Sequence, residues 1–320
     1  MDRNLALEFV RVTEVAAIAA ARWAGKGDKI KADQAAVDEM RSRFNAVEFD
    51  GIVVIGEGEK DNAPYLYTGE KIGNKQGPKM DIAVDPLECT ENTAKGKSNA
   101  MSVLAAGPRG SMLKVPGTYM NHICVGPDAV NAIDINKPID YNIKSVAEAL
   151  GKPVGDLMVC LLERDRHKEL LSQIRATGCR VKLIEHGTVS AGISTCMPYA
   201  DIDMLVGTGG APEAIIIASA LKCLGGNIQA MMAPHNEKTL KECKEFGLPL
   251  DKVYRMNDLA KGDNFLFAAT GVSDGSLLNG VRFHKDKIIT HSLVLRSKTK
   301  TKRFITTEHY CDPCTALPEK

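Results

Sequence analysis

The stretch Met80–Thr90 places two carboxylates and a hydroxyl directly after an apolar run. Pro86 follows Asp85, and because proline has no N–H to donate, it predicts that the strand stops there. Glu88 and Thr90 lie within five residues of Asp85. The carboxylates are hard oxygen ligands that suit Mg²⁺ or Mn²⁺, and Thr90 would touch whatever the metals activate. The alternative is an ordinary Asp-Pro turn that leads into a helix cap.

Further carboxylates lie at the expected ends of other elements. Asp33 is near the start of a helix, where the helix dipole alone would stabilise it by about 0.3–1 kcal/mol. Glu57 belongs to Gly56–Asp61, which holds three carboxylates in five residues and needs solvent or a cation to offset their repulsion. Glu213 follows a Gly-rich turn at a helix start. Together these residues could hold two or more Mg²⁺ or Mn²⁺ ions.

The second half of the chain supplies groups that bind phosphate. Arg164 and Arg166 carry forked guanidinium groups that suit phosphate oxygens. The loops expected at Gly187–Thr188 and Gly209–Gly210 can offer backbone N–H groups to an anion. No Gly-Lys-Ser/Thr follows the second loop, which argues against a P-loop kinase or ATPase. Carboxylates in one half and phosphate donors in the other predict a metal-dependent phosphatase.

The elements that must position these residues alternate between strand and helix. Helical spacing of apolar residues predicts one helix over 5–23 and a second with Val37, Met40 and Phe44 on its buried face. The expected strands are 51–55, 81–84, 99–105, 119–125, 157–162, 181–184, 204–206, 264–270 and 288–295. Because polar residues gather at the carboxyl ends of these strands, we expect an α/β fold with its ligands bound there.

The change of rhythm near residues 150–155 predicts a domain boundary. We expect a metal-binding, catalytic domain over 1–152 and a sugar-phosphate-binding α/β domain over 153–320, and we leave open a return of the last strands to the first domain. The length of 320 residues also favours two domains.

Composition excludes several classes of protein. A net charge of +1 argues against binding to nucleic acid or a membrane, and no apolar stretch reaches the roughly 18 residues of a membrane-spanning helix. The chain starts without the pattern of a signal peptide. Its nine cysteines are scattered, which favours reduced thiols in the cytoplasm. The pair Cys311 and Cys314 is more typical of an incidental tail than of a zinc or redox site.

Several long motifs, in order, resemble the bacterial class II fructose-1,6-bisphosphatases, a family that includes cyanobacterial enzymes acting on sedoheptulose 1,7-bisphosphate. The motifs are Gly27–Ala36, Val53–Glu59, Ala63–Glu70, Asp81–Glu88 and Gly209–Glu213. The resemblance runs from about residue 4 to residue 310. The family is similar in turn to the lithium-sensitive phosphatases, whose cores share Asp-Pro-x-Asp-Gly-Thr/Ser.

The resemblance implies hydrolysis of the 1-phosphate of fructose 1,6-bisphosphate in gluconeogenesis, with Mg²⁺ or Mn²⁺. It also implies a layered αβαβα sandwich of two domains, of the sugar-phosphatase type, and a homodimer or homotetramer.

The resemblance assigns roles residue by residue. The metal ligands would be Asp33 and Glu57 for one ion and Asp85, Glu88 and Glu213 for another. Thr90 would orient or activate the attacking water with Asp33 or Glu57 as acceptor, and Lys29 and Asp61 are further catalytic candidates. The residues expected to contact substrate are Glu88, Cys89, Thr90, Tyr119, Arg164, Asp165, Arg166, His186, Gly187, Thr188 and Gly210.

This sequence departs from the family pattern at two places. Cys89 stands where the family has glycine, and if that position needs a positive φ, a Cβ there costs about 1–2 kcal/mol. His186-Gly187-Thr188 stands where the family typically has Asp-Gly-Asp. These changes leave two alternatives open: a phosphatase of sedoheptulose 1,7-bisphosphate or an inositol phosphate, or a weakly catalytic sugar-phosphate-binding protein. The choice between Mg²⁺ and Mn²⁺ also stays open.

Overall fold

The computed structural model describes residues 5–58 and 64–310, and the chain divides into two compact units. The first unit combines Met1–Gly110 with Asn264–Lys320, and the second is Ser111–Asp263. Each unit has its own mixed sheet with helices packed on it, so the expected α/β class is confirmed.

The boundary expected near residue 152 is misplaced. β5 (Tyr119–Val125) pairs with β8 (Met204–Gly210), so the second sheet already recruits its first strand well before that residue. The return of the last strands, left open from sequence, does occur, because β11 (Leu266–Gly271) pairs with β4 (Met101–Pro108) in the first sheet.

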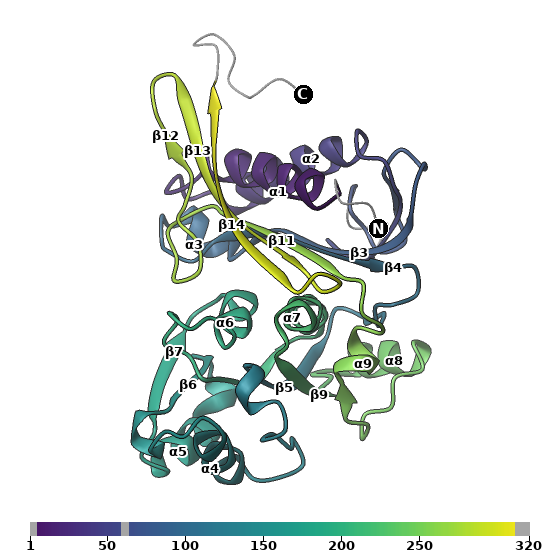
Figure 1. Ribbon diagram of the computed structural model, residues 1–320. Coiled ribbons are helices and arrows are strands. Elements are labelled where there is room, and N and C mark those ends of the chain that lie inside the picture. Colours follow the sequence, from purple (N-terminus) through teal and green to yellow (C-terminus); the bar gives the residue numbers. More distant parts are fainter. Residues whose placement is uncertain (1–4, 59–63, 311–320) are drawn as a thin grey trace. The chain divides into compact units, whose positions relative to one another are not determined.

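The first sheet has eight strands in the order β12-β13-β11-β4-β3-β1-β2, with β14 also paired to β13 (Figure 1). Besides β4 and β11, its strands are β1 (Asp50–Ile55), β2 (Lys71–Ile72), β3 (Lys79–Glu88), β12 (Arg282–Phe283), β13 (Lys287–Arg296) and β14 (Thr301–Tyr310). The pair β1–β3 is parallel and the other pairs are antiparallel. This single parallel pair matters for the site, because it brings two strand ends to one edge.

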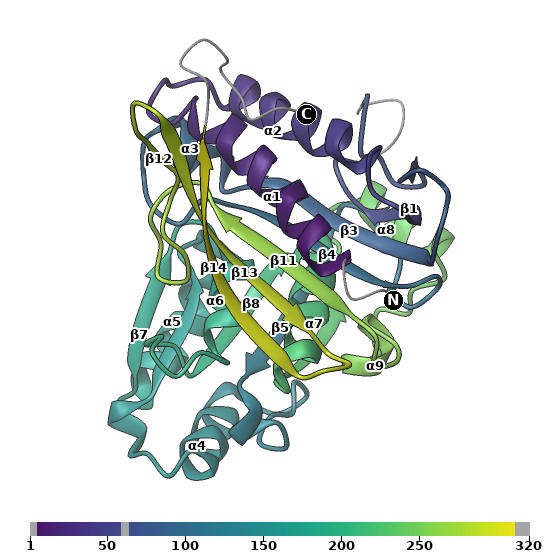
Figure 2. The same cartoon turned by 45° about the horizontal axis from the view of Figure 1, so that its top comes forward.

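Helices α1 (Leu5–Ala21) and α2 (Lys29–Phe44) run side by side against this sheet, as Figure 2 shows. Their apolar faces carry the first core, in which the Phe9 and Phe49 rings meet edge to face with centroids 5.4 Å apart. The short helix α3 (Thr90–Ala94) packs against α2. Apolar spacing predicted both long helices correctly.

The second sheet has six strands in the order β10-β9-β5-β8-β6-β7. Its further strands are β6 (Met158–Leu162), β7 (Arg180–Ile184), β9 (Asn227–Met232) and β10 (Tyr254–Arg255), and its α-helices are α4 (Ile139–Ala149), α5 (Lys168–Ala176), α6 (Thr188–Ser194), α7 (Ala211–Leu224), α8 (Glu237–Glu245) and α9 (Met256–Leu259). Figure 1 shows α4 and α5 on one face of this sheet and α6 and α7 on the other. The second core lies on the α4–α5 face and includes Ile123, Ile143 and Val206.

Two strands extend beyond their expected ends. β3 continues through Pro86 to Glu88, with a register irregularity between Asp85 and Glu88 instead of a stop. β8 continues to Gly210, so the expected glycine loop is a strand whose Gly209 pairs with Met120. These glycines stay extended because they pair with β5 along its length.

No helix in the described ranges is long and apolar enough to cross a membrane.

Candidate active site

The parallel pair β1–β3 brings Glu57 and Asp85 to the same edge of the first sheet. The register pairs Ile55 with Ala83. Glu57 comes two residues after Ile55, and Asp85 comes two residues after Ala83. The carboxyl ends of neighbouring parallel strands are where α/β sheets bind ligands. Local strand geometry therefore places the two acidic residues at the same end of the strand pair.

The loop after β1 holds Glu57 in place. Its N–H donates to the carbonyl of Leu66 at 3.0 Å. Gly56 permits this approach, since a Cβ there would lie 2.0 Å from the same carbonyl oxygen. The Glu70 carboxylate accepts hydrogen bonds from the Leu66 N–H and from Arg41. Arg41 and Glu70 are thus positioning residues that sequence reasoning did not single out, although Glu70 lies within a motif that carried the resemblance.

Asp33 lies on α2 beyond its first turn, which holds no acidic residue. The helix is capped by Asp28, whose carboxylate accepts from the Lys31 N–H at 3.0 Å. The proposed alternative for Asp33, a dipole-stabilised carboxylate in the first turn, is therefore wrong. Its carboxylate has a different environment, described next.

Asp33 and Glu57 form an electrostatically coupled pair. Burial raises the pKa of Asp33 to about 6. Burial, followed by the negative charge of Asp33, raises the pKa of Glu57 to about 7. Among the described residues, no cation contributes to either shift. A divalent cation would relieve the repulsion between these two half-buried carboxylates.

The turn between β3 and α3 carries the remaining acidic and hydroxyl groups of this unit. Glu88 is buried at the end of β3, while Asp85 and Thr90 are half-buried. Cys89 is the N-cap of α3 with φ +70° and ψ +47°, the left-handed conformation. Thr90 is the first residue of the helix. The positive φ expected at this position is therefore present.

We predict that Cys89→Gly is more stable than Cys89→Ala, by about 1 kcal/mol. Both variants remove the buried thiol, but alanine keeps the Cβ that costs about 1–2 kcal/mol at positive φ. The glycine variant gives back about 0.5–1 kcal/mol of this difference, because glycine makes the unfolded chain more flexible. Urea unfolding midpoints of the two variants check the difference, and an alanine variant as stable as the glycine variant would show that the turn is unstrained.

The structure places one of the two further catalytic candidates. Lys29 begins α2, and its ammonium donates to Glu91 of α3 at 2.9 Å. Lys29 and Lys95 together lower the pKa of Glu91. Lys29 thus ties the two helices that carry Asp33 and Thr90. Asp61 lies outside the described residues.

In the second unit, Arg166 and Tyr119 form one cluster. The Arg166 guanidinium lies 4.8 Å from the Tyr119 ring centroid and donates to the carbonyl of Thr208 at 2.8 Å. The Tyr119 ring also lies against the His235 ring, with the two ring centroids 4.6 Å apart. An arginine stacked on an aromatic ring is held in one orientation, which suits a phosphate-binding role.

Arg164 is tied to the turn that carries His186, Gly187 and Thr188. Its guanidinium donates to the carbonyl of Glu185 at 2.5 Å. Gly187 has φ +94° and caps α6, which begins at the buried Thr188. The positive φ explains why glycine stands between two residues that depart from the family pattern.

Asp165 makes a local ion pair. Its exposed carboxylate lies 2.9 Å from the Lys168 ammonium, which lowers the pKa of Asp165. Both residues, with Arg164, line a pocket of about 390 Å³ beside β6 and α5.

Glu213 folds back over the start of α7. A Cβ at Gly210 would lie 1.7 Å from the Glu213 Oε2, so only glycine leaves room for the carboxylate. Burial raises the pKa of Glu213, while its own backbone N–H lowers it. Gly210 therefore positions this acid, and its main-chain groups belong to the ladder with Tyr119 instead of to an open anion loop.

His167 is a positioning residue that the sequence reasoning missed. Its Nε2 accepts the Thr208 N–H at 2.8 Å, so Nδ1 carries the proton that is donated to the Leu162 carbonyl, also at 2.8 Å. Burial lowers its pKa, which keeps the ring neutral. The histidine thus links β6 and β8 beside Arg166. Its place within Arg164–His167 was the available signal.

Residues 271–275 match the Gly-x-Ser-x-Gly pattern of a nucleophile elbow, but the structure does not build one. The segment leaves β11, and the next element is the strand β12 instead of a helix. The Ser273 hydroxyl accepts the N–H of Ala100 at 3.0 Å. Ser273 is therefore a structural residue.

The acidic groups of the first unit fit a divalent cation in charge and donor type. Asp33, Glu57, Asp85 and Glu88 offer only oxygen, which suits Mg²⁺ or Mn²⁺. Within residues 5–58 and 64–310, no three His, Cys, Asp or Glu side chains already converge at metal-ligand spacing.

Comparison with known proteins shows the class of enzyme to which the chain belongs. Residues 3–309 match the family described as bacterial fructose-1,6-bisphosphatase, glpX-encoded, so the chain is a phosphoric monoester hydrolase.

The curated relatives give the family in full. Fructose-1,6-bisphosphatase 1 class 2 of Escherichia coli (strain K12) is 44% identical over 325 aligned residues, which cover 98% of this chain and 97% of the relative. The class 2 enzymes of Escherichia coli O6:H1 and Shigella flexneri match to the same extent. The chain belongs to the class II fructose-1,6-bisphosphatase family, which is metal-dependent, and it hydrolyses the 1-phosphate of fructose 1,6-bisphosphate in gluconeogenesis.

Proposed function

We propose that two or more Mg²⁺ or Mn²⁺ ions are held by the carboxylates at the carboxyl ends of β1 and β3. The observation that carries this proposal is the parallel register that brings Glu57 and Asp85 to one edge. Asp33 and Glu57 are the ligands of one ion. Asp85, Glu88 and Glu213 are the ligands of another.

The residues of this chain then divide the work of hydrolysis. Bound metal supplies Lewis-acid activation of water and of the phosphoryl oxygens. The Thr90 hydroxyl, at the start of α3, orients the attacking water. Glu57 or Asp33 accepts the proton of this water, as the family resemblance implies.

Arg164 and Arg166 bind the phosphate groups of the sugar, and Tyr119 holds the second guanidinium in place. Glu88, Cys89 and Thr90 contact the substrate. The turn at His186–Thr188, Asp165 and Gly210 contact it as well. Lys29 and Asp61 act in support of catalysis.

Removal of metal is expected to abolish turnover. Phosphate release from fructose 1,6-bisphosphate should fall to background in EDTA and return when Mg²⁺ or Mn²⁺ is added in excess. The measurement uses purified, reduced protein and a panel that includes sedoheptulose 1,7-bisphosphate and inositol phosphates. Full activity in EDTA would contradict the metal-dependent mechanism, and faster release from another ester would move the substrate assignment.

We further propose that the protein self-associates as a dimer or tetramer, which sedimentation would test. We also propose that it works in the cytoplasm, a reducing compartment, because its cysteines form no disulfide among the described residues.

A further inference from the structure

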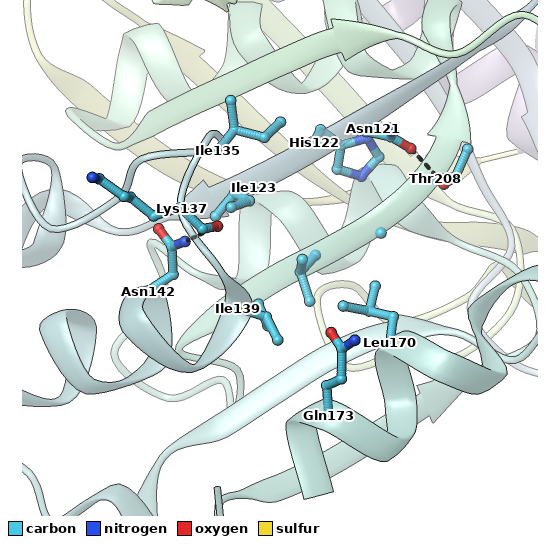
Figure 3. Close-up of a pocket in the computed structure, with 12 residues that line it drawn as sticks. Asn121, His122, Ile123, Ile135, Lys137, Ile139, Asn142, Leu170, Gln173 and Thr208 are labelled. Atoms are coloured by element: carbon cyan, nitrogen blue, oxygen red, sulfur yellow. Dashed lines mark hydrogen bonds between the residues drawn. The ribbon is translucent and has the colours of Figure 1, made fainter. Parts of the chain in front are cut away.

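A pocket of about 190 Å³ opens in the second unit between the strand pair β5–β8 and the helices α4 and α5 (Figure 3). Its body is apolar and is lined by Ile123, Ile135, Ile139, Leu170 and Val206. Polar groups are contributed by Asn121, Gln173 and Thr208. None of the side chains assigned above to substrate or metal is among its lining residues. The established reaction therefore gives this pocket no role.

The rim of the pocket is fixed by buried amides. Residues 133–138, here called the rim segment, carry Ile135 and Lys137. The fully buried Asn142 makes four hydrogen bonds of 2.7–3.2 Å to the backbone of this segment. Gln229, also buried, adds one bond of 3.0 Å and one of 2.8 Å. A rim held this firmly needs no ligand to order it, which lowers the entropic cost of binding.

The charge balance of the lining favours an anion. Lys137 is the one residue among the described lining that is charged at neutral pH, since burial lowers the pKa of His122 to about 4. Figure 3 shows the Lys137 ammonium directed outward from the rim. Its flexible four-carbon stem allows it to turn over the opening when an anion enters.

We propose that this pocket binds a small organic monoanion, a carboxylate carried on a compact aromatic or branched hydrocarbon body. The apolar side chains take the body, and Lys137 with the Asn121 and Gln173 amides takes the carboxylate. The volume is somewhat larger than the roughly 150 Å³ that accommodates benzene in an engineered cavity. A single ring or a branched chain of similar size therefore fits.

Thr208 links the pocket to the cluster of Arg166 and Tyr119. Its hydroxyl donates to Asn121 at 2.6 Å, at the wall of the pocket, and its carbonyl accepts from Arg166 at 2.8 Å. A ligand that moves Thr208 therefore acts on the residue that holds Arg166. This link, which rests on the proposed substrate role of Arg166, predicts a change in KM of at least twofold with kcat unchanged.

The first test measures binding without any use of catalysis. Fluorine NMR of 4-fluorobenzoate with the full chain is expected to show saturable binding with a Kd on the order of 1 mM. The neutral 4-fluorobenzamide should bind at least fivefold more weakly. Lys137→Gln should weaken benzoate binding at least fivefold. Lys144→Gln, which removes another exposed lysine of the same region, should leave it unchanged.

Three results would overturn the proposal: no binding of the benzoate to folded wild type, equal binding to Lys137→Gln, or equal binding of the amide. Competitive displacement by fructose 6-phosphate would place the probe in the sugar-phosphate site and also overturn it. Because phosphate release is measured separately, loss of activity with binding intact would bear only on the proposed catalytic site.

Discussion

Thr90→Ala is expected to lower kcat for fructose 1,6-bisphosphate by about 10²–10⁴-fold, the range for loss of a group that takes part in proton transfer. Thr90 is the first residue of α3, directly after the left-handed Cys89 and two residues after the buried Glu88. The start of the helix fixes its backbone, and its β-branched side chain has few χ1 rotamers. Since a threonine hydroxyl in this role is no metal ligand, Mn²⁺ affinity measured by titration calorimetry should change less than twofold.

Two control variants separate chemistry from structure. Thr90→Ser keeps the hydroxyl and should recover most of the turnover. Thr93→Val changes a second threonine of the same helix, which is fully buried and whose hydroxyl makes no hydrogen bond among the described residues. It should leave kcat within about twofold. Near-normal turnover of Thr90→Ala, or equal losses in Thr93→Val, would show that Thr90 has no direct part in the reaction.

Elements with a strong local pattern were predictable. The helices α1 and α2 have apolar residues at helical spacing, and β5 was expected over the residues that form it. The predicted strand ends were wrong where residue type favoured a break and strand pairing favoured an extended chain. Pro86 and the glycines that end β8 are typical strand breakers, yet β3 and β8 each continue through them alongside one neighbouring strand, β4 and β5 respectively. Tertiary pairing overrode the local signal in both cases.

The domain boundary failed for a different reason. A change of rhythm near residue 152 marks where parallel strands begin, but β5 belongs to the same sheet although it is antiparallel to its neighbours β8 and β9. Sheet membership depends on which strands pair, and this long-range choice leaves no trace in local spacing. The helices α4 and α8 and the strand β9 were not predicted, although both helices have a clear amphipathic pattern.

Candidate site residues came from residue type and placement and from motif resemblance, and their local geometry explains several of them. Cys89 and Gly187 occupy positions with positive φ, and Gly210 leaves room for Glu213. The residues that sequence reasoning missed, such as His167 and Arg41, act through other residues. A positioning role depends on contacts between distant segments, so residue type and spacing do not reveal it.

Glu57→Gln is expected to weaken metal binding and to remove its dependence on pH between 6 and 8. Burial and the charge of Asp33 raise the pKa of Glu57 to about 7, so at pH 6 most of this carboxyl is protonated and a metal must displace the proton. In wild type, Mn²⁺ affinity should therefore fall about tenfold per pH unit below 7 and level off above it.

The same shift sets the stability of the metal-free protein. A carboxyl whose pKa is raised on folding favours the folded state at low pH, and this contribution is lost as pH rises from the ordinary value of 4.5 through 7. Metal-free wild type should thus be about 1 kcal/mol less stable at pH 8 than at pH 6 from Glu57 alone. Glu57→Gln should lack this difference, while Glu48→Gln, at an exposed site of the same unit, should keep it. Identical pH profiles for wild type and Glu57→Gln, in both metal affinity and unfolding, would show that Glu57 is neither a ligand nor the group that titrates.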